Sequence, residues 1–391
     1  MLRIAVVFGL ALSIIPSLGH AKDKIKIGFI TTLSGPNAEL GQEMSNAFKL
    51  AVQSLGGKVG GLPTEIITGD DESKADVGRK IADKMVEDDH VDVITGIVYS
   101  NVVQALAKPV LDSGTILVSG NANTPQLAGA ECRPNFFSLA AQLDTLGEII
   151  GIAAQKNGYK RVYVLAGNYV AGRAPVEGFK RDFKGEVVGE AYPPLGQLDF
   201  AVEIAQLKAA KPDAVYSGFT GGMVVAFVKQ YTQAGLMKEL PFISVWGAYE
   251  PFSQLEAAGE SAVGARGGAY YHWQLDNPAN KHFVADFEKA YHAKPGHVAA
   301  SEYDAVNLLD SAVRAVNGKI EDKTAFSAAI KQAKFASVRG PSFKFNNNNF
   351  PILNYYETVV VKAADGKIET RLGDILARDL PDFYAKDCPI K

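Results

Sequence analysis

Two short polar segments follow two apolar runs of the sequence, and both are rich in hydrogen-bond donors. Ser100-Asn101 follows the run Val91–Val98 and opens a predicted helix, and Asn121-Ala122-Asn123 follows the run TILVSG. Backbone N–H groups in the first turn of a helix favour an anion, and a serine hydroxyl adds a donor. The two segments therefore predict a carboxylate site, although Ser and Asn are also ordinary helix caps and turn residues.

An alternation of strand and helix patterns must position these segments. Lys24–Thr32 and Val91–Val98 have the apolar, β-branched pattern of strands, and Ser73–Glu87 has apolar residues at helical spacing. The same alternation starts again at a predicted helix over Asp144–Gln155. Strands that alternate with helices predict parallel sheets covered by helices on both faces. The sequence therefore predicts an α/β fold with two doubly wound parallel-sheet lobes.

The last third of the chain has a different pattern. Three helices are predicted at Asn280–His292, Ala299–Val316 and Lys323–Lys334, and the turn signal Asn346–Asn349 and one strand, YYETVVVK, follow them. One strand is too few for a third sheet domain. We therefore expect this part to complete the first two lobes, so that the chain crosses between them several times.

The first 21 residues have the pattern of a secretory signal peptide. A cation at Arg3 precedes an apolar run over Ile4–Ile15, and small residues close the stretch at Ala21. The apolar run is shorter than the roughly 20 residues that a membrane span needs. The alternative to a cleaved signal peptide is an uncleaved N-terminal anchor. We expect cleavage after Ala21 and export to the periplasm. The net charge is −3 and the sequence has no basic tract. We therefore expect no nucleic-acid partner and no direct membrane insertion.

Catalytic and metal-binding patterns are absent from the sequence. It contains no GxSxG motif, no HExxH motif and no glycine-rich phosphate loop. The two cysteines, Cys132 and Cys388, predict a disulfide in an oxidising compartment, with two free thiols as the alternative. The histidines from His272 to His297 are expected to be solvated, and Asp70-Asp71 to be turn residues. We therefore predict no enzyme activity, no cofactor and no bound metal.

Four stretches carry a resemblance to a known family. They are IKIGFITTLSGPNAELGQEMSNAFKLAV, DDESKADVGRKIADKMVEDDHVDVITGIVYSNVVQALAKPV, ILVSGNANTPQL and PDAVYSGFTGGMVVAFVKQYTQAGL. In this order and spacing the chain resembles the branched-chain amino-acid type of periplasmic solute-binding proteins. The resemblance implies a type I binding protein whose lobes are joined by three crossing strands and close on a ligand in the cleft between them. It also implies a monomer that works with a membrane-embedded ABC permease.

The expected division of the chain follows from this resemblance. Residues 1–21 are the signal peptide. The N-terminal lobe comprises residues 22–142 and 273–345. The C-terminal lobe comprises residues 143–272 and 346–391.

In the resembled family, the two polar loops described above hold the α-carboxylate of the ligand, and aromatic residues supply further walls. The residues predicted to contact the ligand are Leu40, Ser100, Asn101, Asn121, Ala122, Asn123, Tyr169, Phe219, Trp246 and Tyr303. The cluster Tyr270–Trp273 is expected to be a contact between the lobes, with a place in the cleft as the alternative.

One position departs from the family. Amino-acid binders have a glutamate just after the strand that corresponds to PFISVWG, where it binds the ligand's ammonium, and this chain has Trp246. An indole cannot neutralise a buried ammonium, but it offers an apolar face to a flat ring. The alternative role of Trp246 is ordinary packing within its lobe. Ala171 stands where relatives commonly have a tyrosine, which makes room. The sequence favours an aromatic acid such as benzoate or a hydroxycinnamate. The alternatives are a branched-chain or other amino acid, an amide and, more distantly, an exported enzyme.

Overall fold

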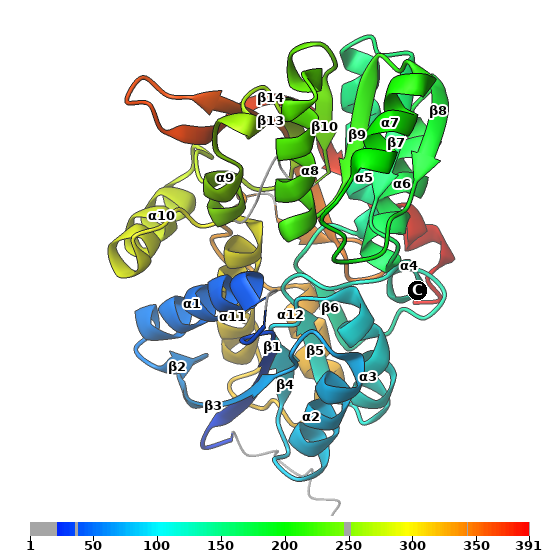
Figure 1. Cartoon of the computed structure of the whole chain (residues 1–391). Coiled ribbons are helices and arrows are strands. Elements are labelled where there is room, and N and C mark those ends of the chain that lie inside the picture. Colours follow the sequence, from blue (N-terminus) through cyan, green and yellow to red (C-terminus); the bar gives the residue numbers. More distant parts are fainter. Residues whose placement is uncertain (1–21, 36–37, 246–251, 342, 391) are drawn as a thin grey trace, which may run out of the picture.

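Two β-sheets form the centres of two lobes in the computed structural model, which describes residues 22–35, 38–245, 252–341 and 343–390. Figure 1 shows the N-terminal lobe below and the C-terminal lobe above it. This arrangement confirms the predicted α/β class with two lobes. The signal peptide expected over residues 1–21 lies outside the described residues.

The sheet of the N-terminal lobe is parallel apart from one short strand at its edge. Its strands, in spatial order, are β2 (Lys58–Val59), β3 (Leu62–Asp70), β1 (Ile25–Thr31), β4 (Val93–Thr95), β5 (Ile116–Ser119) and β6 (Phe136–Ser138). The order runs outward in both directions from β1, as in a doubly wound sheet, so ligands are expected beyond the carboxyl ends of β1, β4 and β5.

Helices from two distant parts of the chain belong to this lobe. They are α1 (Ala38–Ser54), α2 (Ala75–Glu87), α3 (Ser100–Asp112), α4 (Pro125–Ala128), α10 (Pro278–Tyr291), α11 (His297–Ala315) and α12 (Lys323–Lys331). Helix α11 packs along α1 and against β2 and β5. The late part of the chain therefore completes the early lobe.

The sheet of the C-terminal lobe mixes parallel and antiparallel strands. In spatial order they are β12 (Lys344–Phe345), β13 (Pro351–Lys362), β11 (Arg266–Ala269), β10 (Phe242–Ser244), β9 (Ala214–Gly218), β7 (Arg161–Ala166) and β8 (Glu186–Ala191), and β14 (Ile368–Leu380) pairs with β13. Strands β7 to β11 are parallel, whereas β13 is antiparallel to both β11 and β14. In Figure 1 the β13–β14 hairpin projects from this lobe.

The helices of the C-terminal lobe follow the same alternation. They are α5 (Leu143–Lys156), α6 (Val170–Asp182), α7 (Ala201–Ala210), α8 (Gly222–Gln233) and α9 (Phe252–Ala258), with the short 3-10 helices η1 (Leu236–Lys238), η2 (Gly259–Ala262) and η3 (Phe383–Asp387). None of the described helices combines the length and the apolar character that a bilayer span requires.

Some elements differ from the expected ones. The apolar run Val91–Val98 is a strand only over Val93–Thr95, because Gly96 turns the backbone with a φ of 102°. The sequence does not predict β14, which is partly exposed and whose register with β13 shifts repeatedly. The expectation of solvated histidines is wrong for His272, which is fully buried with its Nε2 3.0 Å from Thr370 Oγ1.

The chain passes between the sheets three times: after β6, after β11, and between α12 and β13. The expected lobe boundaries stay a proposal: residues 22–142 and 273–345 for the N-terminal lobe, and residues 143–272 and 346–391 for the C-terminal lobe. The chain near the third passage departs from them, because β12 pairs with β13 and Asn349 O accepts a hydrogen bond of 3.1 Å from Ser138 N of β6.

A disulfide bond joins Cys132 and Cys388, whose Cα atoms are 5.7 Å apart, and this confirms the predicted pairing. The bond holds the C-terminal tail beside the N-terminal lobe, where η3 packs on α4. In the same tail the hydroxyl of Tyr384 donates to Asp144 Oδ2 at 2.7 Å, at the start of α5. The tail therefore contacts both lobes.

A buried carboxyl lies at the carboxyl edge of the N-terminal sheet. Glu302 of α11 is fully buried, and its Oε1 accepts a hydrogen bond of 2.8 Å from Thr95 Oγ1 at the end of β4. Its Oε2 lies against Gly120, where a Cβ would be only 2.1 Å away, so a larger residue would displace the carboxyl. Burial raises the pKa of Glu302 to about 8, although the Thr95 hydrogen bond opposes this. The carboxyl is therefore mostly protonated at neutral pH.

We expect the double variant Cys132→Ser, Cys388→Ser to have a free energy of unfolding roughly 2–4 kcal/mol lower than the oxidised protein, because the bond restricts the unfolded chain. Equilibrium urea unfolding measures the difference. Alkylation of the denatured but unreduced protein is the control, and labelling of both cysteines would contradict the bond.

The free energy of unfolding should fall less steeply with rising pH in the Glu302→Gln variant than in the wild type. The carboxyl holds its proton up to about pH 8 in the folded chain but only to about pH 4.5 in the unfolded chain. Between these values unfolding releases a proton, so the free energy of unfolding falls by up to about 1.4 kcal/mol per pH unit. Glutamine carries no such proton.

Urea unfolding at about pH 5.5 and about pH 7.5 tests this expectation, and the glutamine variant should lose about 2 kcal/mol less than the wild type between them. The exposed Glu87→Gln variant is the control and should retain the wild-type pH dependence. Equal pH dependence in Glu302→Gln and wild type would show that this carboxyl is ionised in the folded chain.

Candidate functional site

A cavity of about 650 Å³, part of it open to solvent, lies between the lobes. The N-terminal lobe contributes Leu40, Val98, Tyr99, Ser100, Asn121, Ala122, Asn123 and His297. The C-terminal lobe contributes Tyr169, Ala171, Thr220 and Gln254, and the passages between the lobes with the start of α5 contribute Ala140, Ala141, Leu143, Leu146 and Tyr270.

The first turn of α3 reaches this cavity through Ser100. Tyr99, the residue before the helix, has extended backbone and makes no side-chain capping bond. Ser100 is 4% exposed, and its Oγ has no hydrogen-bond partner among the described residues. A buried hydroxyl left without a partner costs about 1–3 kcal/mol. Together with the positive end of the helix dipole, this unsatisfied donor favours a bound anion.

The loop after β5 is held against that turn. Asn121 Nδ2 donates to Val98 O at 2.8 Å. Asn123 Nδ2 donates to Asn121 O at 3.2 Å and to Ala141 O at 3.0 Å, and its Oδ1 accepts from Leu143 N at 3.3 Å. Both amide hydrogens of Asn123 therefore bond to backbone carbonyls. The Asn123 side chain positions the loop and the start of α5 rather than offering a free donor.

The opposite wall of the cavity carries hydroxyl groups and an aromatic ring. The hydroxyl of Tyr169, which precedes α6, lies 3.3 Å from Thr220 Oγ1, and burial raises the pKa of Tyr169. Ala171 adds only a methyl group to this wall. The ring of Tyr270 meets the ring of His297 edge-on, with centroids 5.6 Å apart. His297 is largely buried here, so the expectation that it is solvated is wrong.

The structure brings some of the predicted contact residues together and leaves others elsewhere. Those that line the cavity are Leu40, Ser100, Asn121, Ala122, Asn123 and Tyr169. Asn101, one position further along α3, is exposed and donates to Ser73 O at 3.2 Å. Phe219 packs in the core of the C-terminal lobe, and Tyr303 packs on Phe283 in the N-terminal lobe. Trp246 lies outside the described residues.

Several cavity residues are absent from the predicted contacts, among them Thr220, Gln254 and His297. Thr220 follows β9, so the rule that ligands meet the carboxyl ends of strands could have found it. Gln254 and His297 enter from α9 and from the first residue of α11. Neither has a local sequence signal, because helix positions near a cleft look like any other helix position.

The cavity lining is mostly apolar. Among the described residues that line it, none is Asp, Glu, Lys or Arg. The described part of the chain also contains no group of three His, Cys, Asp or Glu residues placed to hold a metal ion. The arrangement can therefore bind a small apolar molecule with one anionic group, whereas an ammonium would find no carboxylate among these residues.

Comparison with known proteins agrees with this geometry. Residues 24–367 match the family model described as periplasmic binding protein. The Leu/Ile/Val-binding protein homolog 6 of Brucella melitensis is 26% identical over 377 residues, covering 94% of this chain and 95% of that protein.

Two solved structures are also similar. The solute-binding protein of an ABC transporter from R. palustris, in complex with benzoate, is 32% identical with a TM-score of 0.85, covering 94% of this chain and 99% of that chain. A solute-binding protein from Rhodopseudomonas palustris BisB5, in complex with 3,4-dihydroxy benzoic acid, is 28% identical with a TM-score of 0.83, covering 93% of this chain and 99% of that chain. With the family match over most of its length, the two-lobed fold and the cavity between the lobes, the chain belongs to the periplasmic binding proteins of ABC transporters.

Proposed function

We propose that this chain captures an aromatic carboxylate, of the benzoate or hydroxycinnamate class, in the cavity between its lobes. The observation that carries the proposal is the pairing of an unsatisfied Ser100 hydroxyl at the start of α3 with a lining that has no acidic side chain among the described residues. The first feature suits a carboxylate, and the second suits a ligand without an ammonium group.

The carboxylate would lie against the first turn of α3. There it would accept hydrogen bonds from Ser100 and from the first backbone N–H groups of the helix, in the field of the helix dipole. Hydrogen bonds to a charged acceptor each contribute roughly 1.5–3 kcal/mol. Two or three of them are enough to hold an anion without an Arg or Lys partner.

The ring of the ligand would lie between the apolar residues of the passages and the hydroxyl-bearing wall of the C-terminal lobe. Ala140, Ala141 and Leu146 offer apolar surface, and Ala171 leaves space for a flat group. Contact between a ligand ring and an aromatic side chain such as Tyr270 adds about 0.5–1.5 kcal/mol beyond area burial. The similar solved proteins with benzoate and 3,4-dihydroxy benzoic acid support this ligand class.

Branched-chain amino acids are the second candidate ligand class, because the curated relatives are named Leu/Ile/Val-binding protein homologues. An amino acid would bring an ammonium into a lining that has no carboxylate among its described residues. Leaving that charge unpaired costs several kcal/mol. The sequence adds Trp246 where amino-acid binders of the resembled family have a glutamate.

We further propose that the chain is exported after cleavage of residues 1–21 and works in the periplasm as a monomer. The lobes would close about the three passages to bury the ligand, as periplasmic binding proteins do. The closed protein would then deliver the ligand to a membrane-embedded ABC permease. This role is binding and transport, without catalysis.

Calorimetry on residues 22–391 tests the ligand class. We expect benzoate, 4-hydroxybenzoate or a hydroxycinnamate to bind at micromolar concentration or tighter, and leucine to give no heat of binding. Benzamide has the same ring without the anion and is the matched control, so it should bind more weakly than benzoate. Tight binding of leucine or valine, with no response to aromatic acids, would restore the amino-acid alternative.

We expect Ser100→Ala to weaken benzoate binding by about 10- to 150-fold, because a hydrogen bond to a carboxylate is lost. Asn101→Ala is the matched control, since Asn101 lies on the same helix turn but outside the cavity. Calorimetric titration of both variants measures the change, and thermal unfolding checks that each is folded. Affinity within a few-fold of wild type in Ser100→Ala would place the carboxylate elsewhere.

A further inference from the structure

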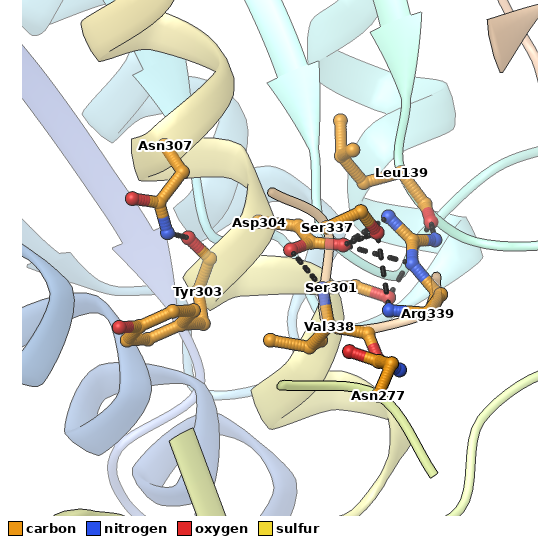
Figure 2. A network of polar contacts seen from close by, with 9 residues as sticks. All are labelled: Leu139, Asn277, Ser301, Tyr303, Asp304, Asn307, Ser337, Val338 and Arg339. Atoms are coloured by element: carbon orange, nitrogen blue, oxygen red, sulfur yellow. Dashed lines mark hydrogen bonds and ion pairs between the residues drawn. The ribbon is translucent and has the colours of Figure 1, made fainter. Parts of the chain in front are cut away.

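Three chain segments join the lobes, and a buried salt bridge lies where they meet. The first runs from β6 to α5 over residues 139–142, and the second from β11 to α10 over residues 270–277. The third leads from α12 to β13 and includes Ser337–Arg339. Asp304, in the middle of α11, faces this last segment from the N-terminal lobe (Figure 2).

Asp304 is fully buried. Its carboxylate accepts hydrogen bonds from side chains and from the backbone of the third segment. Asp304 Oδ2 accepts from Ser337 Oγ at 2.6 Å and from Arg339 Nε at 3.0 Å, and Oδ1 accepts from Val338 N at 3.0 Å. Arg339 Nη2 also lies 3.0 Å from Oδ2, and only 2% of the Arg339 side chain is exposed. The carboxylate is thus almost saturated with donors from one short segment.

The same cluster holds the other two segments. Arg339 Nη1 donates to the carbonyl oxygen of Leu139 in the first segment, and Ser301 Oγ donates to that oxygen at 3.4 Å. Asn277, the last residue of the second segment, donates from Nδ2 to Val338 O at 3.0 Å. Figure 2 shows Arg339 placed between Asp304 and Leu139. Each of the three segments therefore has at least one residue fixed in this cluster.

Stability alone does not account for a charged pair at this place. Replacing a buried ion pair by apolar residues of similar volume is often neutral or stabilising. Directional hydrogen bonds fix the backbone of the three segments in a single geometry, which apolar packing does not do. The cluster is also continuous with the cavity, because Ala140 and Ala141 directly follow Leu139 and line it, and Tyr270 begins the second segment.

We propose that Asp304 and Arg339 are positioning residues for ligand capture, which fix all three hinge segments to one point beside the N-terminal lobe. Bending between the lobes is then confined to the residues beyond this point, Ala140 and Ala141 among them. The lobes approach each other along one path, and the cavity forms with one geometry. The proposal rests on the proposed function, because capture by closure is the step that the pair serves.

The experiment measures the separation of the lobes and ligand affinity in the same variants. Spin labels at Lys49→Cys on α1 and Lys229→Cys on α8, both exposed positions, report the distance between the lobes while the native disulfide stays in place. We expect Arg339→Lys to broaden this distance distribution without ligand, because lysine keeps the charge but loses the planar fork that reaches both Asp304 and Leu139.

Benzoate is the probe for affinity. We expect Arg339→Lys to bind benzoate more weakly than the wild type. If one tenth of the variant molecules keep the hinge geometry that can bind, the affinity for benzoate falls about tenfold. Ser337→Ala keeps the ion pair, removes one bond to the third segment, and should show a smaller change of the same kind. It decides the question if Arg339→Lys does not fold.

Asp92→Asn is the matched control. Asp92 is also buried and bonds Lys22 Nζ at 2.5 Å and Lys26 N at 3.0 Å, but it lies at the opposite end of β4 from the cavity. It should lower stability while leaving the distance distribution and the affinity as in wild type.

Two results would overturn the proposal. One is a narrow distribution in the folded Arg339→Lys and Ser337→Ala variants, and the other is equal broadening in Asp92→Asn. If the wild type binds no benzoate, the proposed ligand is wrong. The distances in the ligand-free protein still decide the role of the pair.

Discussion

A buried carboxylate and a buried guanidinium, those of Asp304 and Arg339, lie where the segments between the two lobes converge. Removing such charges from water costs several kcal/mol each, which only close pairing and complete hydrogen bonding offset. Here the offset comes from the chain segments themselves, through Ser337, Val338 and the carbonyl of Leu139. The charges are therefore satisfied only when these segments are in place, and the cluster holds the segments together beside the N-terminal lobe.

The cavity shows how two lobes of similar architecture supply different chemistry. The N-terminal lobe presents the start of α3 and a serine hydroxyl that has no partner in the described part of the chain. The C-terminal lobe presents Tyr169 and Thr220, which contact each other. A carboxylate held by helix N–H groups and a hydroxyl needs no basic side chain, and it exchanges water for donors that are already oriented. Such a site suits a protein that must bind its ligand and also release it.

Residues near strand ends were predictable, and residues that act through distant contacts were not. Ser100 and Asn121 follow apolar strands, so the geometry of parallel sheets places them at the cleft. Phe219 also follows a strand but packs in the core, because neighbouring residues at a strand end point to opposite sides and the sequence does not settle which one faces the cleft. Asp304 and Arg339 look like two ordinary charged residues in the sequence, and only the folded chain brings them together. His297 was not predictable for the same reason. It is the first residue of α11, which packs on a sheet whose strands come much earlier in the chain.

The three passages between the lobes have a consequence for how the chain folds. The N-terminal sheet is covered by helices that are synthesised after most strands of the other lobe, so the first lobe stays incomplete until α10 and α11 exist. Contacts such as Tyr291 OH to Asn46 O and Gly60 N to Asp310 Oδ1 join residues 245 and 250 positions apart. Contacts of such long range slow folding and leave partly folded chains with exposed apolar surface. Until these helices dock, the α1 surface that packs against them is open to solvent and to other chains.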